Sequence, residues 1–167
     1  MATLKKLSVH GDKSKSKVYF FLNGDFNVTD ITAIIGLEPT CSFNKGDINR
    51  IFVKKDGSPS CYEFSQWCYG TEYEYTRDID EQCDRIVSQL NKKQDEIVSV
   101  TSKYNCYVGF EIVSVIEKGL TPGLGLNQKI MNFCTSVKAN IDIDIYANPY
   151  DESENTIEID LPDDNNT

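Results

Sequence analysis

The sequence predicts an α+β fold, with a mainly antiparallel sheet and about three helices packed on one face of it. First, segments with strand-like alternation and segments with helical periodicity follow one another along the chain. Second, 167 residues with 40% hydrophobic and 26% charged side chains suit one globular domain with a single core. Third, a strand, a turn and a helix over 18–36 correspond to a strand, a loop and a helix over 106–138. A ferredoxin-like fold with two βαβ-like halves would account for this internal similarity.

The N-terminal half begins with a strand followed by a short helix. The segment 17–23 (KVYFFLN) is rich in aromatic and β-branched residues, which predicts a buried strand. Asn27 or Thr29 can cap a helix over 30–35. Gly36 suits the left-handed position that follows the last turn of such a helix.

The stretch between Phe43 and Tyr75 is predicted to hold two or three strands, with a turn at 56–59 (Asp-Gly-Ser-Pro). Trp67 lies there in the densest aromatic cluster of the chain, whose other members are Tyr62, Phe64, Tyr69, Tyr73 and Tyr75. Packing in the core is one interpretation of this cluster. An exposed binding patch centred on Trp67 is the other.

The clearest helical pattern starts at Asp78, which resembles a capping-box residue because Glu81 follows three positions later. Apolar side chains recur at helical spacing from there to Thr101, so we expect one long helix. Beyond it, the pattern predicts a strand over 106–116, a helix over about 127–138, and two alternating segments over 141–146 and 157–161.

The net charge of −9 is concentrated at the C-terminal end. Acidic and basic side chains balance over 1–138, whereas 139–167 hold nine acidic side chains and no basic one. We therefore expect a flexible basic arm over 1–16, a single domain over 17–161 and an acidic tail over 162–167. An acidic end of this density repels nucleic acid and attracts basic protein surfaces.

Two acidic strand faces are the main candidate for a binding site. In 141–146 (IDIDIY) the isoleucines face one way and leave Asp142, Asp144 and Tyr146 on the other side. The same alternation places Glu158 and Asp160 together in 157–161, and a loop with three further acidic residues, Asp151, Glu152 and Glu154, lies between the two segments. A hairpin of the two segments would gather four carboxylates. A solvated edge, a site for a partner's Lys and Arg side chains, and a divalent cation site are the alternatives. The spacing lacks the pattern of a calcium loop, so we predict no metal.

Other chemistry is largely excluded. The single histidine, His10, lies in a polar segment, which removes most mechanisms that pair a nucleophile with an imidazole. None of the six cysteines forms a Cys-x-x-Cys pair, and the loop 121–127 (TPGLGLN) lacks the lysine of a P-loop. No apolar run exceeds about five residues, and no signal peptide is recognisable. We predict a cytoplasmic protein without membrane association, enzymatic activity or cofactor.

Several motifs of this chain resemble one known family. They are FFLNGDFNVTDITAIIGLEPT, a following NKGD, the lone Trp67 and a terminal IDIDIY. Together they resemble the bacterial family called domain of unknown function 4279, over about Val18 to Tyr146. The resemblance implies a small cytosolic α+β protein and brings no established activity, cofactor or catalytic residue. The acidic extension after Tyr146 lies outside it.

These observations favour a non-enzymatic binding protein. Small bacterial domains with an acidic face and no catalytic set are often immunity proteins, so by analogy we expect a basic toxin or effector domain as the partner. Asp142, Asp144, Glu158, Asp160 and the 151–154 loop would pair with its Lys and Arg side chains. Alternatives are a small-molecule- or ion-binding domain that uses the Trp67 cluster, and a phage-encoded acidic inhibitor of a defence enzyme.

Overall fold

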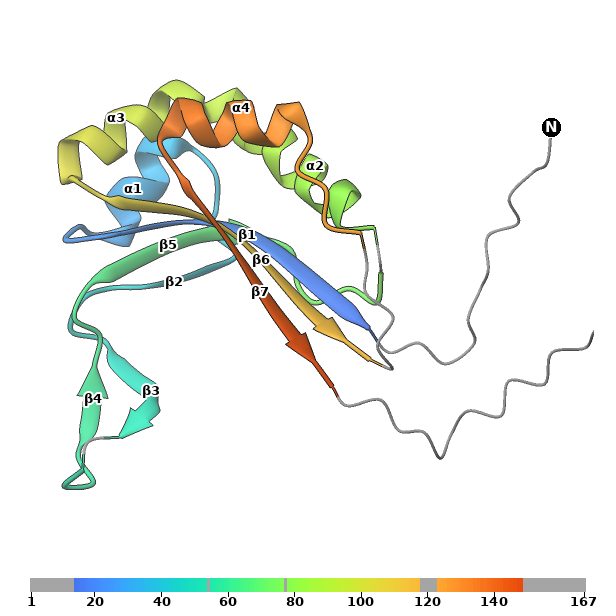
Figure 1. Cartoon of the computed structure of the whole chain (residues 1–167). Helices are drawn as coiled ribbons and strands as arrows, with labels where there is room; N and C mark the ends of the chain where they lie inside the picture. Colours follow the sequence, from blue (N-terminus) through green and yellow to red (C-terminus); the bar gives the residue numbers. More distant parts are fainter. Residues whose placement is uncertain (1–13, 54, 77, 118–122, 149–167) are drawn as a thin grey trace, which may run out of the picture.

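A five-stranded sheet carries the helices of the described part of the chain on one of its faces (Figure 1). The computed structural model describes residues 14–53, 55–76, 78–117 and 123–148. The strand order is β2-β5-β1-β6-β7. These strands are β1 (Lys15–Gly24), β2 (Cys41–Phe43), β5 (Ser65–Gly70), β6 (Tyr107–Ile116) and β7 (Asn140–Ala147). Only β6 and β7 pair in parallel, and the other neighbours in this sheet are antiparallel.

The helices are α1 (Val28–Ile35), α2 (Ile79–Leu90), α3 (Gln94–Tyr104) and α4 (Gln128–Val137), with one turn of 3₁₀ helix, η1 (Asn91–Lys93), between α2 and α3. A separate hairpin of β3 (Ile48–Val53) and β4 (Pro59–Cys61) projects away from the main sheet (Figure 1). The predicted α+β class, with a mainly antiparallel sheet and helices on one face, is confirmed.

The ferredoxin-like arrangement is present in the first four strands of the sheet. β1, α1 and β2 form one split βαβ unit, because β5 lies between two strands that run in the same direction. β5, α2–α3 and β6 form the other unit, with β1 between its strands. These halves differ from the predicted ones. The 106–138 segment instead leads into β7 and adds a further βαβ unit at the edge of the sheet.

Several local predictions are confirmed by the helix ends. The Asn27 side chain accepts a hydrogen bond from the Thr29 amide at 2.8 Å, and Gly36 ends α1 with a φ of 69°. Asp78 accepts one from the Glu81 amide at 3.1 Å. The single long helix is wrong, because η1 interrupts it between α2 and α3.

The core fills the space between the sheet and the helices. Its largest fully buried side chains include Trp67, Phe20, Phe110 and Phe133. One buried polar pair links the layers: the Ser16 hydroxyl donates to the Gln82 side-chain oxygen at 2.6 Å, and the Gln82 amide nitrogen donates to the Ser16 carbonyl at 3.0 Å. In the described part of the chain no buried side-chain nitrogen or oxygen lacks a partner.

At the edge of the sheet, β7 extends beyond the helical layer (Figure 1). Ile141 packs against the core, whereas Ile143 and Ile145 are 39% and 52% exposed. Near the end of β6, β1 begins at Lys15, within the range expected as a flexible arm. Residues 1–13 of that arm, segment 157–161 and the acidic tail lie outside the described residues.

Candidate functional site

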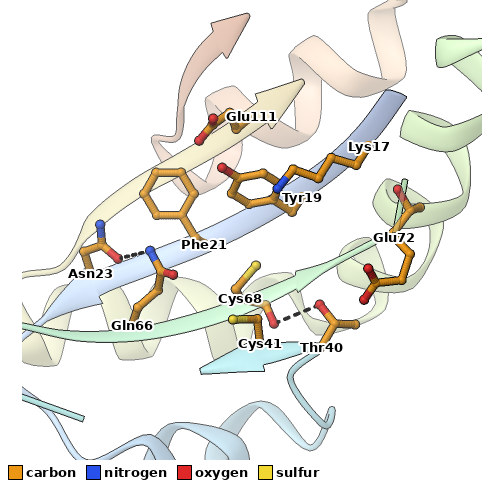
Figure 2. Close-up of a pocket in the computed structure, with 11 residues that line it drawn as sticks. Lys17, Tyr19, Phe21, Asn23, Thr40, Cys41, Gln66, Cys68, Glu72 and Glu111 are labelled. Atoms are coloured by element: carbon orange, nitrogen blue, oxygen red, sulfur yellow. Dashed lines mark hydrogen bonds between the residues drawn. The ribbon is translucent and has the colours of Figure 1, made fainter. Parts of the chain in front are cut away.

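The side of the sheet opposite the helices, here called the open face, is built by simple alternation. On β1, Val18, Phe20 and Leu22 point into the core. The intervening side chains, Lys17, Tyr19, Phe21 and Asn23, therefore point away from the helices, and all four line a hollow on the open face (Figure 2).

Strand register brings three carboxylates together on this face. Glu111 of β6 lies opposite Tyr19 of β1 on one side and opposite Asp142 of β7 on the other. Two residues further along, Val113 lies opposite Lys17 and Asp144. Because paired residues share a face of the sheet, Glu111, Asp142 and Asp144 form one acidic strip along β6 and β7. We call these three residues the acidic strip.

Within the described part of the chain, none of the three carboxylates forms an ion pair. Asp142 and Asp144 are exposed, and Glu111 is half-buried. Closely spaced like charges repel, so a cation from outside the described residues would be attracted to this strip.

Tyr19 is held as a neutral hydrogen-bond donor beside the strip. Burial raises the pKa of its hydroxyl above the ordinary value, and so does a hydrogen bond to Glu111. The negative charges of Glu111 and Asp144 act in the same direction.

Aromatic rings cover the centre of the open face. The Phe21 ring lies over Gly109, where a Cβ atom would come within 2.3 Å of Phe21 Cζ. Its centroid is 6.0 Å from that of Tyr19 and 5.9 Å from that of Tyr107. Lys17 Nζ lies 5.0 Å from the ring centroid of Tyr19, and Lys15 Nζ lies 4.8 Å from that of Tyr73, so both lysines of β1 contact aromatic rings. The face thus combines apolar area with segregated charge.

A hollow of about 520 Å³ opens between β1, β2, β5 and β6 (Figure 2). Glu72 and Lys17 contribute charged groups to its wall. The Gln66 amide donates a hydrogen bond to the Asn23 side-chain oxygen at 2.9 Å and fixes both side chains. Cys41 and Cys68 complete the wall on the side of β2 and β5.

The structure places the predicted site residues in three different situations. Asp142 and Asp144 lie on the open face, and Tyr146 shares it, opposite Val115 and 57% exposed. The remaining acidic residues of the prediction, Asp151, Glu152, Glu154, Glu158 and Asp160, lie outside the described residues.

Of the two interpretations of Trp67, packing in the core is confirmed, and the exposed patch with Trp67 as a partner-binding residue is wrong. Its side chain is completely buried, and its indole N–H donates to the Thr32 hydroxyl at 3.2 Å. The physical reason is its register opposite Leu22 of β1, which places the indole on the side of the helices. A partner or ligand on the open face cannot contact it.

Sequence reasoning missed the contribution of β1 and β6 to the site. Lys17 and Tyr19 alternate with core residues, and this period of two was the available signal. The aromatic and β-branched residues of 17–23 predict a buried strand without indicating which side chains face away from the core. The same period of two places Glu111 on the outward side of its strand, but a single acidic residue in an apolar strand does not indicate its neighbours on other strands.

Comparisons with known proteins give one match. The model of a family described as domain of unknown function (DUF4279) matches residues 14–148. No curated protein and no solved structure matches the chain significantly. None of the described helices has the length and apolar character needed to cross a membrane. The described residues also contain no group of three His, Cys, Asp or Glu side chains able to hold a metal ion.

Proposed function

Because the chain belongs to this family of unknown function, we propose its role from the open face itself: a non-enzymatic binding protein that receives a basic surface of a partner protein. The observation that carries the proposal is the acidic strip, three carboxylates in register on neighbouring strands without an ion pair among the described residues. Lys and Arg side chains of a partner would neutralise this repulsion.

The aromatic part of the face supports protein binding rather than simple ion attraction. Tyr146, which follows Asp144 on the open face of β7, is 57% exposed, and Tyr107, further along β6 on the same face and opposite Asn23, is 48% exposed. Tyrosine side chains are enriched at interfaces because they combine a large apolar ring with a polar end. A partner would bury these rings while its cations reach the strip.

The specific form of the proposal is immunity. The partner would be a basic toxin or effector domain, and the protein would occlude it in the bacterial cytoplasm. Complementary charge accelerates association, which an inhibitor of a toxic protein requires. A phage-encoded inhibitor of a defence enzyme would use the same surface, and neighbouring genes distinguish the two.

The test compares two triple variants that change the net charge equally. Glu111→Gln, Asp142→Asn and Asp144→Asn together remove the charge of the acidic strip. Glu38→Gln, Glu63→Gln and Asp95→Asn remove three exposed charges that lie outside it. Wild-type protein first captures partners from lysate of the source cell, and a purified partner then serves for affinity measurements.

We expect the acidic-strip variant to lose at least tenfold in affinity, about 1.4 kcal/mol, mainly through a slower association rate. The control variant should retain wild-type affinity. Equal weakening of both variants would show a general charge effect and contradict the proposal. Immunity predicts in addition that co-expression of the wild type, but not of the acidic-strip variant, restores growth of cells that express the partner.

The hollow supports a second candidate function, the binding of a small polar molecule. Its volume of about 520 Å³ lies in the range of ligand pockets, roughly 300–1,000 Å³. It replaces the predicted site around Trp67, which is on the other side of the sheet. A rise in melting temperature with a small molecule alone, abolished by Gln66→Ala, would favour this function over protein binding.

A further inference from the structure

Two cysteines lie directly opposite each other at the edge of the open face. Cys41 is the first residue of β2, and its register partner on β5 is Cys68. Both line the hollow, and Figure 2 draws their side chains on neighbouring strands. Opposed residues of antiparallel strands have Cβ atoms roughly 4.5–5.5 Å apart. A disulfide needs roughly 3.5–4.5 Å, so a small shift of one strand brings the two sulfur atoms into bonding range.

The two thiols differ in their access to solvent. Cys41 is exposed, whereas Cys68 is only 7% exposed. Burial raises the pKa of Cys68 to about 12, and the nearby Cys41 adds to this effect. An oxidant from solution therefore meets Cys41 first, and Cys68 is positioned to react second.

We propose that Cys41 and Cys68 are a redox modification site that closes to a reversible intramolecular disulfide when the protein meets a peroxide. The sulfur of Cys41 attacks one peroxide oxygen, the O–O bond breaks, and Cys41 becomes a sulfenic acid while hydrogen peroxide releases water. The sulfur of Cys68 then attacks the sulfenic sulfur, and its proton leaves with the hydroxyl group as a second water. In total, two thiols and one hydrogen peroxide give one disulfide and two molecules of water.

The mobility required for closure comes from β2. This strand has three residues, and among the described strands it pairs with β5 alone, because it forms the edge of the sheet. A bond formed after such a shift retains some strain, which makes it easy to reduce. Closure and reopening therefore suit a reversible modification rather than a permanent crosslink.

The other cysteines offer one competing pair. Cys83 of α2 and Cys134 of α4 are close enough to influence each other, but both are buried in the helical layer, away from oxidants in solution. Cys61 on β4 is exposed and lies opposite Ile48 rather than another cysteine. Cys61 serves as the control for oxidation of an exposed thiol without a partner.

The experiment treats the full chain with hydrogen peroxide, blocks remaining thiols under denaturing conditions and maps peptides without reduction. We expect monomeric protein in which four of the six thiols are alkylated, with one crosslinked peptide that joins Cys41 to Cys68. After reduction with dithiothreitol, all six thiols should again be alkylated. Cys61→Ser should leave the crosslink unchanged, whereas Cys41→Ser and Cys68→Ala should abolish it.

Other outcomes overturn the proposal. A crosslink between Cys83 and Cys134, or a dimer joined through Cys41 or Cys61, would show that register does not select the reactive pair. Oxidation of Cys41 beyond the sulfenic acid while Cys68 stays free would show that the buried thiol does not respond. If Cys68→Ala fails to fold, the Cys41→Ser variant provides the same comparison from the exposed side of the pair.

Discussion

Replacing Gly109 by alanine places a methyl group where the ring of Phe21 now lies. The added Cβ would come 2.3 Å from Phe21 Cζ and 2.4 Å from Cε1, well inside van der Waals contact. Phe21 is only 7% exposed, and its ring is flanked by those of Tyr19 and Tyr107. The ring must therefore tilt out of the aromatic row, or β1 and β6 must separate locally.

The size of the effect follows from two opposing contributions. Forcing an extra carbon into a packed site costs about 1–3 kcal/mol. Glycine to alanine inside a strand regains roughly 0.5–1 kcal/mol, since the unfolded chain loses conformational freedom. The net change in the wild-type background is a loss of about 1–2 kcal/mol in the free energy of unfolding. Phe21→Leu removes Cζ and Cε1, so in that background Gly109→Ala should stabilise the protein by roughly 0.5–1 kcal/mol.

Urea denaturation of the wild type, both single variants and the double variant measures the coupling between the two positions. We expect about 2 kcal/mol, with a change of sign in the effect of Gly109→Ala. If Gly109→Ala destabilises both backgrounds equally, within about 0.5 kcal/mol, the space that Gly109 leaves for the Phe21 ring is not the reason for its effect.

Three further predictions concern the stability of the fold. Gln82→Leu leaves the buried Ser16 hydroxyl without its acceptor and should lower the free energy of unfolding, measured by urea denaturation, by about 1–3 kcal/mol. Adding Ser16→Ala should recover part of this stability, because the unpaired hydroxyl is then absent. Asp78→Ala removes the cap of α2 and should cost about 1 kcal/mol, seen as a melting temperature lower by about 2–4 °C, whereas Asp78→Asn should retain most of the stability. Burial raises the pKa of the Cys83 thiol from 9.0 to about 12, so the unfolded chain releases this proton first as the pH rises. The stability that the protonated thiol contributes is complete below pH 9.0 and is lost between pH 9.0 and about 12. In that interval the unfolding free energy of Cys83→Ala should therefore fall less steeply with pH than that of the wild type.

Local features of the fold could be predicted because neighbouring residues determine them. Asn27, Gly36 and Asp78 mark helix ends through their own side chains or backbone conformations, and each acts within a few residues. The α+β class followed from the order of the periodic segments for the same reason.

The break between α2 and α3 could not be predicted from periodicity. Leu90 and Ile97 are two helical turns apart, so both fit one continuous stripe. The six residues between them are polar and carry no information about the direction of the chain. Only packing shows that η1 separates two helices.

In the candidate site, too, features set by local alternation could be predicted and features set by strand register could not. Alternation in 141–146 placed Asp142 and Asp144 on one face, and the structure agrees. Their proximity to Glu111 depends on the register between β6 and β7, which joins residues far apart in the sequence. The burial of Trp67 likewise depends on its pairing with Leu22.

The position of β1 at the centre of the sheet also governs the order in which the chain can assemble during synthesis. β1 is made before β6, yet Val18 pairs with Ile112 of β6, and that partner leaves the ribosome only after α2 and α3. Until then, the apolar side of β1 can be covered only through β5 and the first helices. The pairing of β1 with β6 joins residues that are far apart in the sequence, so a long stretch of chain must be closed into a loop. This requirement slows folding. The incomplete sheet leaves one side of β1 unpaired, and an unpaired strand edge of this kind favours aggregation.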